Sequence, residues 1–507
     1  MPVGLLSLSN ELLTIIITFA AEASPDLSRT SILCRLRLTC SRISASATPV
    51  LFRSFSLRPY DPSIERFHAL LNDPSPSGPR SLVRRVVFSC EADELEEEDD
   101  DYWGWKSWGP ELIDVKREWH MAVARLPELE NVQHVYVRFP PNSLGTGTGM
   151  GWITTFPNSS VLILRRTILV AVFEAIVSMR QSLRVLSIEN LLNFVDTDFT
   201  KKSCFTKVIT SIQELHISIA ADIDEKDPRH TFPLPPPASR FWPFFASVWL
   251  APASPHLSSL TLYCNVEFGA VPYWQDCFFS TVGQDTVALA FPRLSSLTLG
   301  RYALAYKSQV EDFLANAASL PELRRLTLDD CPIVSHLSLQ DWDKISPVYR
   351  ERLDMVKTMV LVGDGRHILA SRLHWDTVFD RLREGLPSLK TFVFTRGPWE
   401  DDTAFRKRDS NVSRFLPRRY LSYHEDVEPT EFVEPMADEK DDAADGHVKY
   451  YFEVFESYDH ATPWEAHKVK EDESLQPPSN DPKVHRAELE AFNRLNEALS
   501  QRRQPHY

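Results

Sequence analysis

A short pattern of apolar positions, apolar-x-x-apolar-x-apolar, recurs between about residues 80 and 395. Three copies are nearly verbatim: HLSSLTL, RLSSLTL and ELRRLTL. The last two apolar positions alternate with polar ones, as they do on a strand that buries one face. The pattern therefore predicts eight short strands, each entered through a turn. Their apolar positions are Val83/Val86/Phe88, Val132/Val135/Val137, Leu183/Leu186/Ile188, Ile212/Leu215/Ile217, Leu257/Leu260/Leu262, Leu294/Leu297/Leu299, Leu323/Leu326/Leu328 and Leu389/Phe392/Phe394.

Helical periodicity lies between the predicted strands, for example in residues 310–317 and 378–382. Alternation of strands and helices is typical of parallel strands joined by right-handed crossovers. One such unit cannot bury its own apolar face, so the units must stack. We therefore expect an α/β fold, an irregular leucine-rich-repeat solenoid over about residues 80–400 with parallel strands and crossover helices.

The copies are spaced irregularly, 29 to 66 residues apart, whereas a standard leucine-rich repeat has about 20–29. Either some repeats are degenerate or loops are inserted between them. The longest interval, residues 329–388, is expected to add helices of its own. Beyond it we expect a partly disordered C-terminal extension over 401–507. This extension is acidic at 425–447, can form a strand near 448–458 and ends in a predicted helix near 483–503.

The first 58 residues are expected to form a small helical unit. Asn10 can cap a helix, and the apolar residues after it recur at helical spacing. A second periodic stretch runs from Ile32 to Ile43, and Pro49 is expected to mark a turn. The apolar residues of the first helix are Leu12, Leu13, Ile16, Phe19 and Ala20.

Composition narrows the class of protein. Of the 507 residues, 43% are hydrophobic and 25% charged, which is near the globular average and excludes disorder throughout. The 16 glycines are few for a phosphate-cradling enzyme core. Nine of the eleven residues from Glu91 to Asp101 are acidic and supply most of the net charge of −15. Because a basic footprint is absent, we expect no nucleic-acid partner, and an anionic membrane would repel the chain.

The acidic run is followed by Trp103, Trp105 and Trp108. Aromatic anchors beside negative charge are one way to recruit a basic partner segment. We favour a simpler interpretation, in which the acidic segment is a disordered insertion and its tryptophans pack on the solenoid.

Candidate chemistry is sparse. The seven scattered cysteines form no C-x-x-C pair and no zinc-binding spacing with histidine. This fits a reduced intracellular protein of the cytoplasm or nucleus. The longest apolar run, Leu12 to Ala21, is too short to cross a bilayer. No P-loop, G-x-S-x-G or H-E-x-x-H occurs. We therefore expect a non-enzymatic protein with no catalytic residue, cofactor, metal or membrane partner.

Three stretches of the N-terminal unit resemble an F-box. Residues 8–13 (LSNELL) resemble its opening Leu-Pro-x-Glu-Leu-Leu. Residues 36–42 (LRLTCSR) resemble its Leu-Arg-x-x-Cys-x-Arg helix, and residues 47–53 (ATPVLFR) its Pro-x-Leu-Phe-Arg end. Ser9 and Ile43 stand where the family usually has a proline and an aromatic residue. With the repeats that follow, the whole chain resembles fungal F-box proteins with degenerate leucine-rich repeats.

The resemblance implies a substrate receptor of a cullin–RING ubiquitin ligase, in which other subunits transfer the ubiquitin. The F-box would dock on the Skp-type adaptor, and the solenoid would hold an unknown protein substrate. The implied adaptor-binding residues are Leu8, Ser9, Glu11, Leu12, Ile16, Leu33, Leu36 and Cys40. On the concave strand face, side chains at alternate positions should point outward. The candidate substrate-binding residues there are Thr261, Tyr263, Thr298, Arg301, Thr327 and Asp329.

Two alternatives stay open at this point. In the first, the N-terminal helices only cap the solenoid, and the chain is a repeat scaffold or inhibitor-type binder without a ligase. In the second, the chain is an enzyme of unrecognised type. That alternative requires a deep polar pocket with carboxylates of strongly shifted pKa.

Overall fold

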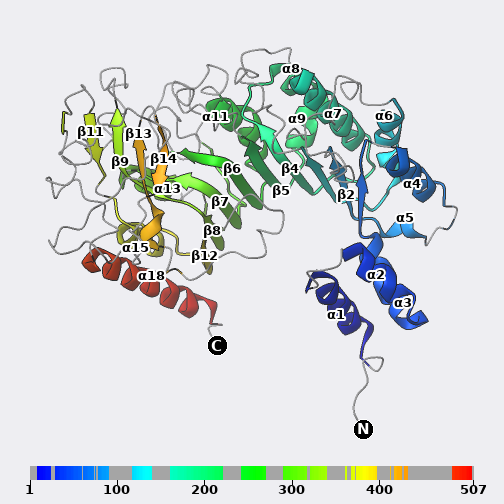
Figure 1. Ribbon diagram of the computed structural model, residues 1–507, viewed down its shortest axis with the longest axis horizontal. Coiled ribbons are helices and arrows are strands. Elements are labelled where there is room, and N and C mark those ends of the chain that lie inside the picture. Colours follow the sequence, from blue (N-terminus) through cyan, green and yellow to red (C-terminus); the bar gives the residue numbers. More distant parts are fainter. Residues whose placement is uncertain are drawn as a thin grey trace, which may run out of the picture. The chain divides into compact units, whose positions relative to one another are not determined.

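The structure is a computed structural model (Figure 1), in which two compact units are described, each by itself. The first consists of Met1–Ser143, Asn158–Asn190 and Asp196–His216, and the second of Leu144–Pro157, Leu191–Val195 and Ile217–Tyr507. The described residues are 8–23, 29–59, 61–73, 75, 78–90, 117–139, 160–220, 241–269, 289–305, 307–316, 320–339, 360–361, 367–371, 373–396, 412, 416–424, 427–431 and 482–504. The acidic insertion at 91–101, the three tryptophans after it and the predicted strand near 448–458 lie outside them.

The first unit alternates helices and strands along the chain. Its elements are α1 (Asn10–Ala23), α2 (Arg29–Arg37), α3 (Ser41–Phe52), β1 (Ser54–Leu57), α4 (Asp61–Leu71), α5 (Pro79–Leu82), β2 (Arg85–Ser89), α6 (Arg117–Ala124), η5 (Leu126–Glu128), β3 (His134–Arg138), α7 (Ser160–Val177), β4 (Val185–Leu192), α8 (Thr197–Thr200), α9 (Ser203–Ile209) and β5 (Glu214–Ala220). The boundary between the units falls within β4 and β5.

The second unit continues the alternation and adds further strands. Its elements are α11 (Phe241–Phe244), η8 (Phe245–Leu250), α12 (Ala251–Ala253), β6 (Ser259–Gly269), β7 (Ser296–Ala303), α13 (Lys307–Asn316), β8 (Arg325–Asp329), β9 (Ile333–Leu339), β10 (Val360–Leu361), β11 (His367–Ala370), α15 (Trp375–Gly385), β12 (Thr391–Thr395), η12 (Leu416–Arg419), β13 (Tyr420–His424), β14 (Val427–Glu431) and α18 (Pro482–Arg503).

All eight predicted strands are present, as β2 to β8 and β12, and β1 precedes them. In the first unit, β1, β2, β3 and β4 pair in parallel in that order. In the second, β6, β7, β8 and β12 do the same. Equivalent positions of the pattern face each other, since Leu297 pairs with Leu260 on one side and Leu326 on the other. The expected mixed α/β architecture with a parallel sheet is therefore confirmed.

The apolar strand positions are buried because they point towards the helices. Phe88 of β2 meets Trp119 of α6 edge-on, with ring centroids 6.1 Å apart. In α7, Phe173 packs against Phe199 of α8 at 5.0 Å and against Phe205 of α9 at 6.1 Å. The alternate strand positions point the other way, and we call their side the polar strand face.

The second unit also contains a sheet that the sequence did not predict, with the order β10-β11-β9-β13-β14. Strands β9, β10 and β11 lie in the interval 329–388, for which only helices were expected. The described part of that interval holds these three strands and one helix, α15. The segment IVSHLSL of β9 starts with two β-branched residues and alternates polar and apolar residues only over its last four positions, which favours a strand over a helix.

Helix α18 spans Pro482–Arg503, where a helix was expected near 483–503, and it packs on α15. The ring of Phe492 lies 5.3 Å from that of Phe379 in α15 and 6.3 Å from that of Phe392 in β12. The buried apolar residues of α18 recur every fourth position, which gives this helix one apolar face. They are Ala491, Leu495 and Leu499.

The last turn of α18 is fixed to the C-terminal end of α15. Arg502 donates hydrogen bonds to the carbonyl oxygens of Arg383 at 2.7 Å and Leu386 at 2.9 Å. The final carbonyls of a helix lack partners within it and favour a positive charge. Arg502 therefore caps α15 and holds the two helices together.

Candidate functional site

The three N-terminal helices pack into a small core of their own. One side of α1 supplies Ile17 and Ala21, and α2 and α3 complete the core with Leu33, Ala47 and Val50. Helix α3 includes Pro49, so the turn predicted there is wrong. The missing N–H costs only one bond, to the carbonyl of Ala45, a residue exposed to solvent.

The opposite side of α1 exposes four apolar side chains. Leu12, Ile15, Ile16 and Phe19 are all exposed, Leu12 by 48% and Phe19 by 68%. They follow the helical spacing i, i+3, i+4, i+7 and so form one stripe, which we call the α1 stripe. Leu38, just after α2, is 87% exposed. The α1 stripe is therefore a candidate interaction surface.

The structure spreads the eight predicted adaptor-binding residues over three environments. Leu12 and Ile16 belong to the α1 stripe, and Ser9 and Glu11 are exposed beside it. Ser9 precedes α1 as its cap, and the Leu12 N–H donates to its hydroxyl at 3.4 Å. The half-buried residues are Leu8, Leu36 and Cys40. Leu33 lies in the helical core and supports the helices from within.

Sequence reasoning missed Ile15, Phe19 and Leu38 as candidate contacts. The signal for the first two was present, because both lie on the same helical stripe as Leu12 and Ile16. No periodicity marks Leu38, whose exposure depends on where α2 ends.

On the polar strand face of the second unit, the candidate substrate-binding residues align in rows. Thr261, Thr298 and Thr327 pair in register across β6, β7 and β8, and all three are half-buried. The next outward row pairs Tyr263 with Gly300 and Gly300 with Asp329. This face is rich in hydroxyl groups, which suits hydrogen bonding to a partner.

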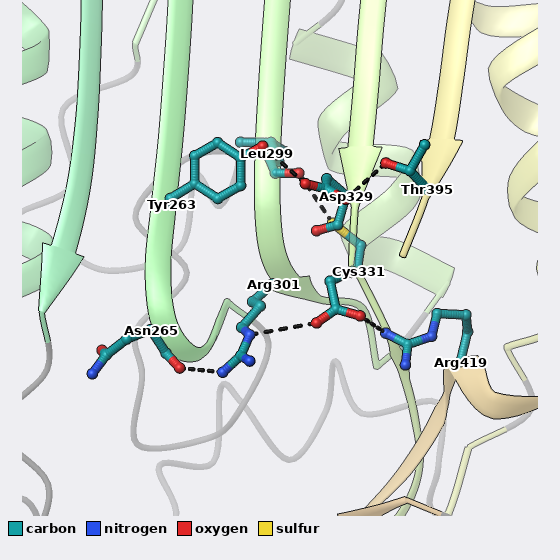
Figure 2. A network of polar contacts seen from close by, with 9 residues as sticks. Tyr263, Asn265, Leu299, Arg301, Asp329, Cys331, Thr395 and Arg419 are labelled. Atoms are coloured by element: carbon teal, nitrogen blue, oxygen red, sulfur yellow. Dashed lines mark hydrogen bonds and ion pairs between the residues drawn. The ribbon is translucent and has the colours of Figure 1, made fainter. Parts of the chain in front are cut away.

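Two of the six candidates are buried, which corrects the expectation that they point freely outward. Asp329 is only 1% exposed, and Tyr263 is also buried. Because Gly300 between them has no side chain, the Tyr263 hydroxyl reaches across β7 and donates to Asp329 Oδ2 at 2.9 Å. The Thr395 hydroxyl donates to Asp329 Oδ1 at 2.7 Å. Figure 2 shows this arrangement, in which Asp329 ties three strands together.

A substitution at Gly300 tests this row. Gly300 is not among the residues with positive φ, so the backbone of β7 admits valine there. We expect Gly300→Val to place a side chain between Tyr263 and Asp329 and to break their hydrogen bond. The expected loss of stability is about 1–3 kcal/mol, as for a buried acceptor without its donor. Thermal unfolding measures it, with Thr298→Val, on the same face of β7, as control. An unfolding temperature of Gly300→Val equal to that of the control would contradict the bridge.

Arg301, the sixth candidate, lies within β7, directly after Gly300. Its φ is 59°, and Asp330, just after the end of β8, has a φ of 55°. Arg301 Nε lies 3.4 Å from Asp330 Oδ2, and the side chain of Arg419 is hydrogen-bonded to the other carboxylate oxygen. Figure 2 shows the side chains of Arg301 and Arg419, with dashed lines that mark these two contacts. Arg301 is therefore part of a network that fixes the chain at Asp330, just after β8.

Cys331 reveals a longer repeat signature than the one that identified the strands. Leu323, Leu326, Leu328 and Cys331 fit L-x-x-L-x-L-x-x-N/C, the consensus of leucine-rich repeats. The Cys331 thiol is buried and donates to the carbonyl oxygen of Leu299, in the preceding repeat, at 3.3 Å. Burial raises the pKa of this thiol. Cys331 therefore joins repeats structurally and is not a reactive nucleophile.

In the first unit, the polar strand face bears charged and aromatic groups that the sequence reasoning did not select. Two guanidinium groups lie over the Tyr136 ring, with the Cζ atom of Arg85 4.8 Å and that of Arg138 5.5 Å from the ring centroid. Its hydroxyl donates to Glu189, which also accepts from Arg138 Nε at 2.7 Å. Burial and the nearby Glu189 carboxylate raise the pKa of Tyr136. Tyr136 is thus held as a neutral phenol.

Two histidines extend this cluster. His134 Nε2 lies 2.8 Å from Ser187 Oγ. Burial, helped by the charges of Arg85 and His216, lowers the pKa of His134 to about 3. Burial also lowers the pKa of His216. Both rings are therefore neutral near pH 7, which suits hydrogen bonding to a partner better than charge attraction. The sequence did contain a signal for this cluster. The outward positions of β3 are His, Tyr and Arg, whereas those of β6 and β7 include serines and threonines.

The described residues offer little for other chemistry. Among them, no group of three or more histidine, cysteine, aspartate or glutamate side chains could hold a metal ion. None of the helices in the described part of the chain combines the length and apolar character needed to span a bilayer.

Comparison with known proteins adds a distant likeness. The chain matches no protein-family profile and no curated protein. Among solved structures, it is similar to the leucine-rich repeat-containing protein LegL7 from Legionella pneumophila, at 12% identity over 68% of this chain and 90% of LegL7, with a TM-score of 0.25. At this TM-score the likeness carries no argument, so the repeat architecture rests on the strand register and the Cys331 consensus.

Proposed function

We propose that this chain is a non-enzymatic recognition subunit of a cullin–RING ubiquitin ligase. In this proposal, the α1 stripe docks on the Skp-type adaptor and the polar strand face holds a protein substrate. The proposal joins the F-box resemblance of residues 8–53 to the exposed apolar residues of α1. Ubiquitin transfer would take place on other subunits.

The observation that supports it most is the division of α1 into two apolar sides. One side fills the helical core, and the other leaves Leu12, Ile15, Ile16 and Phe19 exposed. Burying each such side chain in an interface is worth about 1.5–3 kcal/mol. Contiguous apolar patches on a protein surface mark interaction sites. If the helices only capped the repeats, their core side would suffice and the α1 stripe would have no role.

The test is binding of the full chain to purified Skp-type adaptor, measured by calorimetry or interferometry. We expect Leu12→Asp/Phe19→Asp to weaken binding by about 100-fold or more, because the two charges would be buried in the interface with the adaptor. Met121→Asp is the matched control, since Met121 is equally exposed but lies on α6. We expect this control to bind as the wild type does.

Two results would overturn the proposal. The first is a folded wild-type protein that does not bind the adaptor. The second is binding that Leu12→Asp/Phe19→Asp leaves intact. Circular dichroism of each variant shows whether a loss of binding comes from a loss of folding. We expect each variant to stay folded, because the α1 stripe is exposed and its substitution should leave the core unchanged. In either case, the repeat scaffold without a ligase becomes the better interpretation.

A further inference from the structure

We propose that helix α18 is a pH-responsive strap, which docks on α15 with Glu488 uncharged and detaches more readily once that carboxyl group ionises. The proposal is independent of any adaptor or substrate. It concerns only the second unit, where α18 lies alongside α15 (Figure 1).

Glu488 is buried where α18 meets the start of α15 and the first residue of β13. The N–H of Trp375, the first residue of α15, donates to Glu488 Oε1 at 3.2 Å and to the Tyr420 hydroxyl at 3.2 Å. The Tyr420 hydroxyl in turn donates to Glu488. His374, which precedes α15, makes no side-chain cap. Glu488 therefore supplies the missing cap of α15 from another helix.

The geometry of Glu488 suits a neutral carboxyl better than a carboxylate. Its second oxygen, Oε2, is buried and has no hydrogen-bond partner among the described residues. An ionised carboxylate in an apolar interface is costly unless paired with a cation. The interface around it is apolar, because Trp375 stacks on Phe379 at 5.4 Å and packs against Phe394 at 4.6 Å.

The titratable groups around Glu488 do not offset its charge. From α15 and the residue before it come Asp376 and His374, and from β13 comes Tyr420. On α18, His485 lies one turn earlier. The guanidinium of Arg419 is hydrogen-bonded to Asp330 instead. Asp376 adds negative charge, and burial lowers the pKa of His374 and keeps that ring neutral.

The direction of the pH effect follows from these contacts. Burial raises the pKa of Glu488 from 4.5 to about 7, although the hydrogen bonds from Tyr420 and Trp375 act in the opposite sense. Between these two values the docked helix binds more protons than the detached one, so docking weakens as the pH rises. From pH 6 to pH 8 the equilibrium for detachment should increase by about tenfold.

Hydrogen–deuterium exchange of the full chain tests the strap at pH 6 and pH 8. After correction for the intrinsic pH dependence of exchange, we expect amides of α18 to lose about tenfold in protection at pH 8. Peptides from β6 to β8 serve as an internal reference. Glu488→Gln, which cannot ionise, should give equal protection at both pH values. Glu490→Gln alters an exposed carboxylate on the same helix and should behave as the wild type does.

Equal protection of wild-type α18 at both pH values would overturn the proposal. So would a pH dependence that survives in Glu488→Gln. Tyr420→Phe provides a second variant in case the first does not fold. It removes a donor to the carboxylate, so the midpoint of the transition should move to higher pH. An unchanged midpoint in Tyr420→Phe would also count against the strap.

Discussion

Phe173→Ala should destabilise the first unit by about 3–5 kcal/mol, the usual cost of removing a fully buried phenylalanine. The Phe173 ring of α7 is completely buried and packs against the rings of Phe199 and Phe205, on the two short helices that follow β4. A cavity there cannot be filled easily, because both neighbouring rings are themselves fixed by packing. Calorimetry should show the unfolding temperature falling by roughly 10 °C.

The matched controls for Phe173→Ala lie on the same helix. Ile163 and Val177 are exposed positions of α7, and we expect Ile163→Ala and Val177→Ala to change stability by less than about 0.5 kcal/mol. A loss at Phe173 no larger than at these sites would mean that α7 does not pack on α8 and α9 as described.

Asp330→Asn should lower the free energy of unfolding of the second unit by about 3 kcal/mol, although it removes only one charge. The Asp330 carboxylate lies between Arg301, at 3.4 Å, and Arg419, whose side chain is only 3% exposed. Without it, the Arg419 guanidinium stays buried beside a neutral amide. Asparagine tolerates the φ of 55° at this position, so the loss reports charge and not backbone strain.

A double variant and a surface pair complete this experiment. Asp330→Asn/Arg419→Met removes both buried charges and should be more stable than Asp330→Asn alone. Glu130→Gln breaks an ion pair with Arg180 that is largely exposed, and it should cost less than about 0.5 kcal/mol. If denaturant titration shows that Asp330→Asn loses no more stability than Glu130→Gln, the buried network is not a major support of the second unit.

The strands could be read from the sequence because the pattern is set by local geometry. Leu260, Leu297 and Leu326 each occupy the same place in a short repeat, and parallel pairing brings them into one buried row. Such a row needs only a period of two and a side that faces helices. The final helix could be predicted from the sequence for the same reason, since Leu495 and Leu499 lie on one face.

The environment of the outward positions could not be read in the same way. Tyr263 and Asp329 are 66 residues apart in sequence, and they meet only because glycine occupies the strand between them. Burial of Asp329 thus depends on register across three strands and on the size of a third residue. Burial of Glu488 likewise depends on Tyr420, 68 residues before it. Contacts of this kind leave no periodic trace in a single sequence.

The short strand β1 carries a practical consequence for any deletion that separates the helices from the repeats. A cut at residue 58, the boundary that the helical pattern suggested, would remove Ser54–Leu57, which pair in parallel with Arg85–Phe88 of β2. The N–H and C=O groups on that side of β2 would then be open to any extended chain, including another copy. Self-association of such a truncated protein would report an uncovered strand and not a natural oligomer, so the cut belongs before Ser54.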